Sequence, residues 1–203
     1  PIEMLDTWSW YYEQAAPPAD WNTLGFDASG WDVGGARLGW GSPLIVTNID
    51  HFATTTDRPR AAYWVKEVDI PDASQVVSLT LDTVANDGVV VYVNGTEVAR
   101  HNMRDGEVTH FTYAPSAVNI TTAESSPVII DVPTDLLVNG TNVITAETHV
   151  NYRATRDLSF HLSATMVTNT ADGTVNQAPS ADIAASVTGL DVAVDGTGSS
   201  DAD

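Results

Sequence analysis

The segment Asn151-Tyr152-Arg153 combines the side-chain types that sugar recognition uses. An aromatic ring can stack on the C–H face of a sugar, while amide and guanidinium groups hydrogen-bond its hydroxyls. The segment falls in a polar connection between two expected strands, where binding residues are commonly carried. We therefore predict a carbohydrate site formed by Tyr152, Asn151, Arg153 and His51. The alternative for Tyr152 is a loop tyrosine that packs on its own domain.

Several other aromatic residues are candidates for the same stacking role: Trp10, Tyr11, Tyr12, Trp40, Trp64 and Tyr113. Tryptophan in a β-sandwich more often belongs to the core, and we assign Trp8, Trp21 and Trp31 a structural role. Two prolines, Pro17 and Pro18, place a long loop after the first aromatic segment. We expect Trp21, Phe26 and Trp31 to anchor this loop under the edge of the sandwich.

Local motifs of catalysis are missing from the sequence. It contains no Gly-x-Ser-x-Gly elbow, no phosphate-binding Gly-Lys-Ser/Thr loop and no His-Glu-x-x-His. The five histidines, His51, His101, His110, His149 and His161, show no metal-ligand spacing. We therefore predict a non-catalytic module.

The composition narrows the class of partner. The chain has 203 residues, of which 27 are acidic and 8 are basic, for a formal net charge of -19. This charge repels phosphate groups, so nucleic acids and anionic membranes are poor partners, whereas cations and neutral ligands are compatible with it. No apolar run is long enough to span a bilayer. Cysteine is absent, and any export signal is expected to have been removed or to lie outside this sequence.

The strongest local signal is a hairpin that turns at Asn94-Gly95, between two β-branched or extended runs. Counting outward from this turn predicts the pairs Val93–Thr96, Tyr92–Glu97, Val91–Val98 and Val90–Ala99. The face with Val89, Val91, Val93 and Val98 should enter the core, and the opposite face should be wetter.

Further strands are expected at 7–12, 61–70, 75–84, 128–132, 143–150 and 158–167, separated by turn residues, and no segment shows a sustained helical period. This pattern predicts an all-β fold, a β-sandwich or jelly roll, over residues 1–167. Residues 168–180 have the composition of a linker. In residues 181–203 we expect two strands, at 181–187 and 190–194, which cannot bury a core alone.

The chain from about residue 6 to 167 resembles the galactose-binding-like jelly roll found in secreted bacterial multidomain proteins. The residues that carry this resemblance are Trp8, Trp21, 26–27, Trp31, 38–41, 86–95, 100–103, 137–144, 147–149 and 157–160. Domains of this family are often carbohydrate-binding modules. The resemblance also implies a structural calcium between loops, to which Asp87 and Asp157 are the possible contributors.

The C-terminal segment resembles the start of a polycystic-kidney-disease (PKD) repeat, an immunoglobulin-like spacer, through 176–181 and 194–203. The later strands of that family are absent, so we expect an incomplete immunoglobulin-like fragment. The resemblance implies a second calcium site at Asp201, Asp203 and Asn176. A solvated turn aspartate is the alternative at each of these metal positions.

Together these observations predict a non-catalytic accessory module of an extracellular protein that binds a polysaccharide or cell-surface glycan. Its partners would be that glycan and the neighbouring domains of a larger chain. A structural or protein-interaction module of a cell-surface or secreted assembly, without sugar binding, is the alternative.

Overall fold

The computed structural model describes residues 2–3, 6–169, 184–188, 191–195, 197 and 199. The chain divides into two compact units, Pro1–Thr168 and Asn169–Asp203. Within the described residues, no helix is both long enough and apolar enough to cross a membrane.

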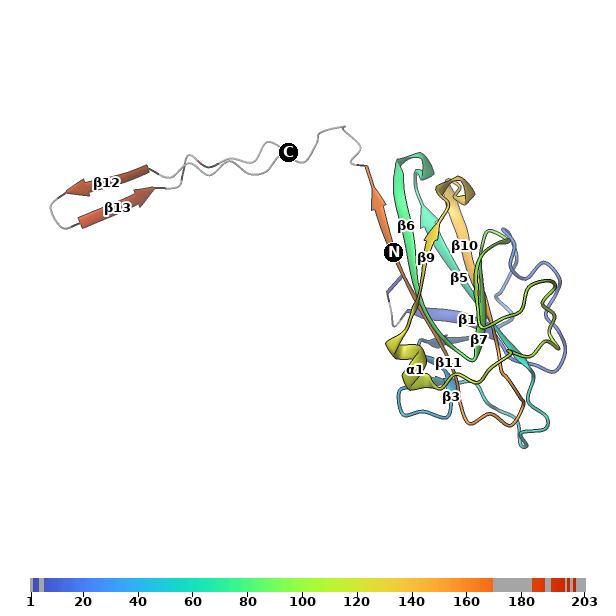
Figure 1. The fold of residues 1–203 in the computed structure, drawn as a ribbon. Helices are drawn as coiled ribbons and strands as arrows, with labels where there is room; N and C mark the ends of the chain where they lie inside the picture. Colours follow the sequence, from blue (N-terminus) through green and yellow to red (C-terminus); the bar gives the residue numbers. More distant parts are fainter. Residues whose placement is uncertain are drawn as a thin grey trace. The chain divides into compact units, whose positions relative to one another are not determined.

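The first unit is a β-sandwich of two sheets, as the sequence predicts (Figure 1). The six-stranded sheet has the order β2 (Asp32–Gly35), β1 (Thr7–Tyr11), β5 (Ala61–Ile70), β10 (Gly140–His149), β7 (Gly88–Val93) and β8 (Thr96–His101). The five-stranded sheet has the order β4 (Thr47–Asn48), β3 (Leu38–Trp40), β11 (Leu158–Thr168), β6 (Val76–Asn86) and β9 (Val128–Val132). Strands β5, β6, β7 and β9, β10, β11 alternate between the sheets, which is typical of jelly-roll connections.

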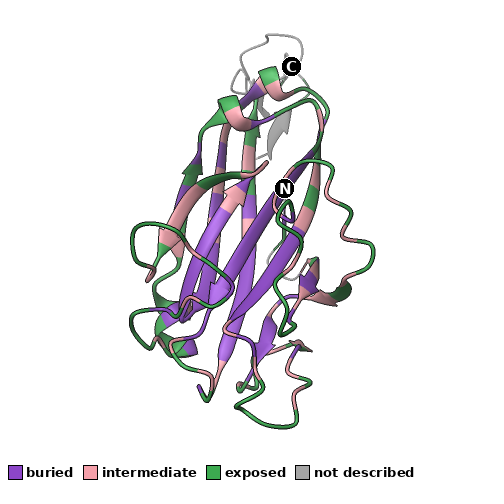
Figure 2. Cartoon of the chain, turned by 90° about the vertical axis from the view of Figure 1, so that its right-hand side faces the viewer, coloured by how far each residue is buried: buried purple, intermediate pink, exposed green. Residues whose placement is uncertain are grey.

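The core lies between the two sheets, and Figure 2 shows the buried residues concentrated along the strands. Its centre is aromatic: Trp64 stacks on Phe160 with ring centroids 4.8 Å apart, and Trp8 meets Phe160 edge-on at 5.1 Å. Val89, Val91 and Val93 of β7 enter this core, and Val98 packs against it, so the predicted core face of the hairpin is confirmed.

The hairpin turn lies at Asn94 and Gly95, which have φ values of 50° and 86°, as the predicted turn type requires. The observed pairs are Val93–Thr96, Tyr92–Glu97, Val91–Ala99, Val90–Arg100 and Val89–His101. The predicted pairs Val91–Val98 and Val90–Ala99 are wrong, because the register shifts at an irregularity between Val91 and Tyr92.

The outer face of the six-stranded sheet is drier than the sequence predicts. Trp21, Tyr63 and Val143 form a second apolar cluster there, with Phe26 and Trp31 packed against it. The loop after β1 therefore does have the predicted aromatic anchors, but they cover the outer face of the sheet. The ring of Trp21 packs edge-on against Tyr63 at 4.9 Å and against Tyr92 at 5.7 Å.

Three short strands and one helix were not predicted. Strands β2, β3 and β4 have too few residues to show a period, and Gly39 interrupts the apolar pattern of β3. A side chain at Gly39, which has a φ of +143°, would place its Cβ 1.9 Å from the carbonyl oxygen of Leu158. The helix α1 (Ile120–Ser125) is a single turn or two, capped by the Asn119 side chain, which accepts from the Thr122 N–H.

His161 on β11 is buried, and its imidazole is neutral at neutral pH. Arg37 donates its Nε–H to His161 Nδ1 at 3.3 Å and also pairs with Glu124 at 2.8 Å. Burial, with a smaller contribution from the Arg37 charge, lowers the pKa of His161 to about 4.

We expect this histidine to make the fold acid-sensitive between pH 6.5 and 4. The unfolded chain binds a proton on His161 below about pH 6.5, whereas the folded chain does not until about pH 4. Its contribution to stability is therefore complete above the unfolded pKa and is lost as the pH falls. Urea unfolding at pH 7 and at pH 5 measures how far the free energy of unfolding falls between the two. For a His161→Gln variant we expect this fall to be about 1 to 2 kcal/mol smaller than for the original protein. Equal losses in the two proteins would contradict this prediction.

In the second unit, β12 (Ala184–Thr188) and β13 (Asp191–Asp195) form an antiparallel pair, close to the two strands expected there. The predicted calcium residues Asn176, Asp201 and Asp203 lie outside the described residues, as does most of the expected linker 168–180.

Candidate functional site

Three connecting segments of the first unit are joined side by side by backbone hydrogen bonds. The Val150 N–H donates to the Arg60 carbonyl at 3.0 Å, and the Ala114 N–H donates to the Val150 carbonyl at 3.1 Å. The Arg60 guanidinium lies over the ring of Tyr113, 4.3 Å from its centroid. We call the side chains gathered here the loop-end surface: Arg60, Phe111, Tyr113, Asn151, Tyr152 and Arg153.

The loop-end surface carries exposed aromatic rings. Phe111 is 58% exposed, Tyr152 is 49% exposed and Tyr113 is 36% exposed. By contrast, four of the other predicted stacking candidates, Trp10, Tyr12, Trp40 and Trp64, are buried, and the fifth, Tyr11, is partly buried against Trp31. Those four predictions were wrong, because their rings fill the core and present no face to a ligand. Phe111 was not singled out, since it lies in a segment with no clear period.

Asn151 and Arg153 are each positioned by a hydrogen bond to another segment of the unit. The Asn151 N–H donates to Asp87 Oδ2 at 2.7 Å, and Arg153 Nη1 donates to the Thr56 carbonyl at 2.9 Å. Three buried polar atoms of the loop-end surface have no hydrogen-bond partner in the described part of the chain: Asn151 Oδ1, Arg153 Nε and Arg60 Nε. The hydrogen-bonding capacity of these three atoms is unused inside the protein, and the exposed part of the surface is carried by the aromatic rings.

His51 occupies a neighbouring position. Its ring stacks on Phe52 with centroids 4.4 Å apart, and its Nε2 lies 3.5 Å from a Glu13 oxygen. His51 and Arg153 both border Tyr12, whose hydroxyl pKa is raised mainly by burial, and the Arg153 charge opposes this shift. No hydrogen bond or ring contact between described residues joins His51 to Asn151, Tyr152 or Arg153.

Asp87 and Asp157, the predicted calcium contributors, lie near each other but serve the fold. The two Asp87 oxygens accept the N–H groups of Val118 and Asn151, both at 2.7 Å, and Asp157 Oδ1 accepts from the Asn86 amide at 3.0 Å. Burial raises the pKa of Asp87, and its two N–H donors oppose that shift. Among the described residues no group of three or more His, Asp or Glu side chains is arranged to hold a metal ion. The calcium site therefore stays a prediction.

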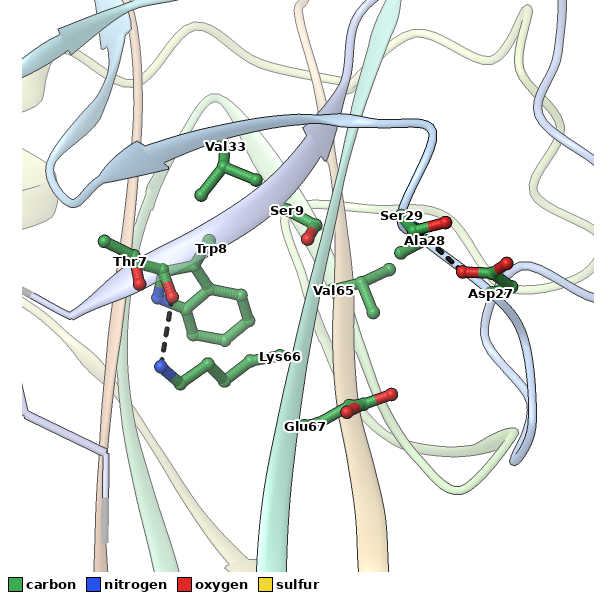
Figure 3. Close-up of a pocket in the computed structure, with 10 residues that line it drawn as sticks. All are labelled: Thr7, Trp8, Ser9, Asp27, Ala28, Ser29, Val33, Val65, Lys66 and Glu67. Carbon is green, nitrogen blue, oxygen red and sulfur yellow. Dashed lines mark hydrogen bonds between the residues drawn. The ribbon is translucent and has the colours of Figure 1, made fainter.

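A groove of about 460 Å³ crosses the edge of the six-stranded sheet between β1, β5 and the 27–29 loop (Figure 3). Lys66 reaches across it to donate to the Thr7 carbonyl at 3.1 Å, and Asp27 accepts from the Ser29 N–H. Its other lining side chains are small or aliphatic apart from the exposed carboxylate of Glu67, and its one aromatic residue, Trp8, belongs to the core. The groove offers no ring for a sugar to stack on.

A pocket of about 500 Å³ lies on the outer face of the six-stranded sheet, beneath the 16–19 and 107–110 loops. We call it the outer-face pocket. Its lining includes Trp21, Tyr63, Tyr92, Glu107, His110 and Glu147. The three rings come from the loop after β1 and from strands β5 and β7, so no local spacing in the sequence could reveal that they meet.

Hydrogen bonds organise the floor of this pocket. The Tyr92 hydroxyl donates to Glu147 Oε1 at 2.6 Å, while Glu147 Oε2 lies 3.0 Å from His149 Nε2. His110 Nδ1 lies 3.1 Å from the Tyr63 hydroxyl.

The protonation of the floor follows from its burial. Burial, with the Glu147 charge, raises the pKa of the Tyr63 and Tyr92 hydroxyls well above the ordinary value. Burial also lowers the pKa of His110. At neutral pH the Tyr63 and Tyr92 hydroxyls and the His110 imidazole are therefore neutral.

Comparison with known proteins shows a similarity of fold alone. No family model and no curated protein matches the chain. Among solved structures, a glycosyl hydrolase family 2 (GH2) member from Bacteroides cellulosilyticus DSM 14838 has a TM-score of 0.54 at 15% identity, covering 82% of this chain and 20% of that chain. A β-glucuronidase from Bacteroides uniformis has a TM-score of 0.50 at 14% identity, covering 79% of this chain and 17% of that chain. The chain thus spans about a fifth of the length of these glycosidases and shares a β-sandwich fold with part of them.

Proposed function

We propose that the first unit is a non-catalytic carbohydrate-binding module that binds a polysaccharide or cell-surface glycan through the loop-end surface. The observation that carries this proposal is that two connecting segments joined by the Ala114–Val150 backbone hydrogen bond carry three exposed aromatic rings, those of Phe111, Tyr113 and Tyr152, with Asn151 and Arg153 flanking Tyr152 in the chain. Rings of this kind stack on sugars, and the adjacent amide and guanidinium groups supply hydroxyl contacts.

Two further considerations support the proposal. The fold recurs in glycosidases, where the matching part is about a fifth of each chain, as would suit an accessory domain. The likeness of residues 6–167 to galactose-binding-like jelly rolls adds the same expectation of glycan binding. We extend the proposal to an extracellular parent protein in which residues 168–180 link the module to a PKD-like segment at 181–203. Weak binding at one site would gain strength from repeated attachment to a polymer.

The decisive experiment is binding of the purified chain to a broad glycan array, with calcium and with a chelator. A Tyr152→Ala variant should weaken binding about tenfold or more, because it removes an exposed stacking ring. The matched control is Val33→Ala, which removes an apolar side chain that is 67% exposed on β2. The control should bind as the original protein does.

Other outcomes would distinguish carbohydrate binding from a structural or protein-interaction role. Silence on a diverse array, from a chain shown to be folded, would overturn carbohydrate binding and favour a structural or protein-interaction module. Binding that Tyr152→Ala leaves unchanged would place the sugar site elsewhere. Loss of binding in the chelator alone would support the proposed calcium ion, and unchanged binding would argue against a calcium requirement.

A further inference from the structure

The outer-face pocket adjoins the loop-end surface, since the His110 ring of its lining meets the Phe111 ring with centroids 5.1 Å apart, but none of the six loop-end residues lines it. It is floored by strands β5, β7 and β10 and is walled by the loop after β1 and by the 107–110 loop. We propose that this pocket is a second binding site, and that its ligand is a single neutral sugar residue.

The lining suits a polyhydroxylated ring. The half-buried ring of Tyr92 is the aromatic side of the pocket, with the largely buried rings of Trp21 and Tyr63 behind it in the lining, and the carboxylate of Glu107 is exposed. Carboxylates are strong acceptors for sugar hydroxyls, and an aromatic side complements the C–H groups of the ring. A pocket of about 500 Å³ is large enough for one sugar residue.

The charge of the pocket selects against acidic sugars. None of the described residues that line it is a lysine or an arginine, while Glu107 and Glu147 both line it. A uronate carboxylate would meet the exposed Glu107 carboxylate and find no lysine or arginine among the described lining residues, inside a chain of net charge -19. A neutral hexose avoids this repulsion and keeps hydroxyl donors for the Glu107 carboxylate, whereas both Glu147 oxygens are already engaged by Tyr92 and His149.

The walls of the pocket are fixed before any ligand arrives. His110 connects the two loops, because its Nε2 lies 3.1 Å from the Gln14 carbonyl while its Nδ1 contacts Tyr63. His149 Nδ1 lies 3.0 Å from the Thr112 carbonyl, which secures the 107–110 loop from its other side. A preformed site loses little conformational entropy on binding, which matters for a ligand as small as one sugar.

The test is a titration of the isotope-labelled full chain followed by NMR, with the indole N–H signal of Trp21 as the reporter. The probes are the methyl glycosides of glucose, galactose and mannose, with methyl glucuronide as the acidic comparison. At least one neutral glycoside should shift the Trp21 signal in a saturable way, and methyl glucuronide should bind at least tenfold more weakly than the best neutral probe.

A pair of matched variants locates the site. Glu107→Gln should weaken neutral-sugar binding about three- to tenfold, because it removes the charge of the exposed carboxylate acceptor. The control is Glu67→Gln, an exposed carboxylate of the groove in Figure 3 outside the pocket, which should change nothing.

Three results would overturn the proposal. These are a Trp21 signal that none of the three neutral glycosides shifts, methyl glucuronide binding as tightly as the best neutral probe, and Glu107→Gln behaving like Glu67→Gln. The glycan array with the Tyr152→Ala variant tests the loop-end surface independently. A negative NMR titration would therefore overturn the proposal for the outer-face pocket alone.

Discussion

Replacing Asp87 with alanine is expected to cost about 3 to 5 kcal/mol of unfolding free energy. The carboxylate is buried and accepts two backbone N–H groups, from Val118 and from Asn151. Without it, both donors are left unpaired, and each buried unpaired donor costs about 1 to 3 kcal/mol. Urea unfolding at pH 7 measures the loss. Because Asn151 belongs to the loop-end surface, glycan binding should fall as well.

Two further variants make the Asp87 result interpretable. Asp105→Ala removes an exposed carboxylate from a loop and should change stability by less than about 0.5 kcal/mol. Asp87→Asn keeps one acceptor oxygen and should lose about half as much stability as Asp87→Ala, which also provides a folded protein if the alanine variant does not fold. An Asp87→Asn protein as stable as the original would show that the second N–H contact contributes nothing.

Replacing Trp64 with alanine should have a similarly large effect, about 3 to 5 kcal/mol. The side chain is fully buried, stacks nearly parallel on Phe160 and donates its indole N–H to the Thr148 hydroxyl at 3.3 Å. Its removal opens a cavity between the two sheets and leaves Phe160 without one of its ring partners. A loss of this size is a large fraction of the total stability of an ordinary domain.

The matched comparison for Trp64 is Trp31→Ala. Trp31 is only partly buried, packing against Tyr11 and Phe26 on the outer face, and we expect its loss to cost about 1 to 2 kcal/mol. Thermal and urea unfolding of both variants give the comparison. Equal losses would mean that the outer aromatic cluster stabilises the fold as much as the central stack does.

The strands of the sandwich could largely be predicted from the sequence, because their period is local. The alternation in β5, β7 and β11, and the Asn94-Gly95 turn, follow from short-range backbone preferences. The irregularity in the central hairpin could not be predicted, since only the pairing itself decides where a register shifts. The short strands β2, β3 and β4 depend on partners far along the chain, which no local pattern identifies.

The candidate sites were less predictable than the fold. Tyr152 was identified because loop polarity is visible in the sequence, and it is indeed exposed. Trp64 and Tyr152 are both aromatic, but only the packing of β5 against the opposite sheet shows that Trp64 is buried. The outer-face pocket was missed entirely, because Trp21, His110 and Glu147 meet only after three distant segments have folded over one face of the sheet.

The strand order also has a consequence for the synthesis of the chain. Strand β10 lies between β5 and β7, and β11 lies between β3 and β6, so the last two strands of the sandwich fill the middle of its sheets. Until β10 is synthesised β5 and β7 lack the strand that joins them, and until β11 is synthesised β3 and β6 lack theirs, so each sheet has free edges up to that point. Folding through such distant pairings is slow. The sandwich can therefore be completed only after its last two strands, β10 and β11, have been synthesised.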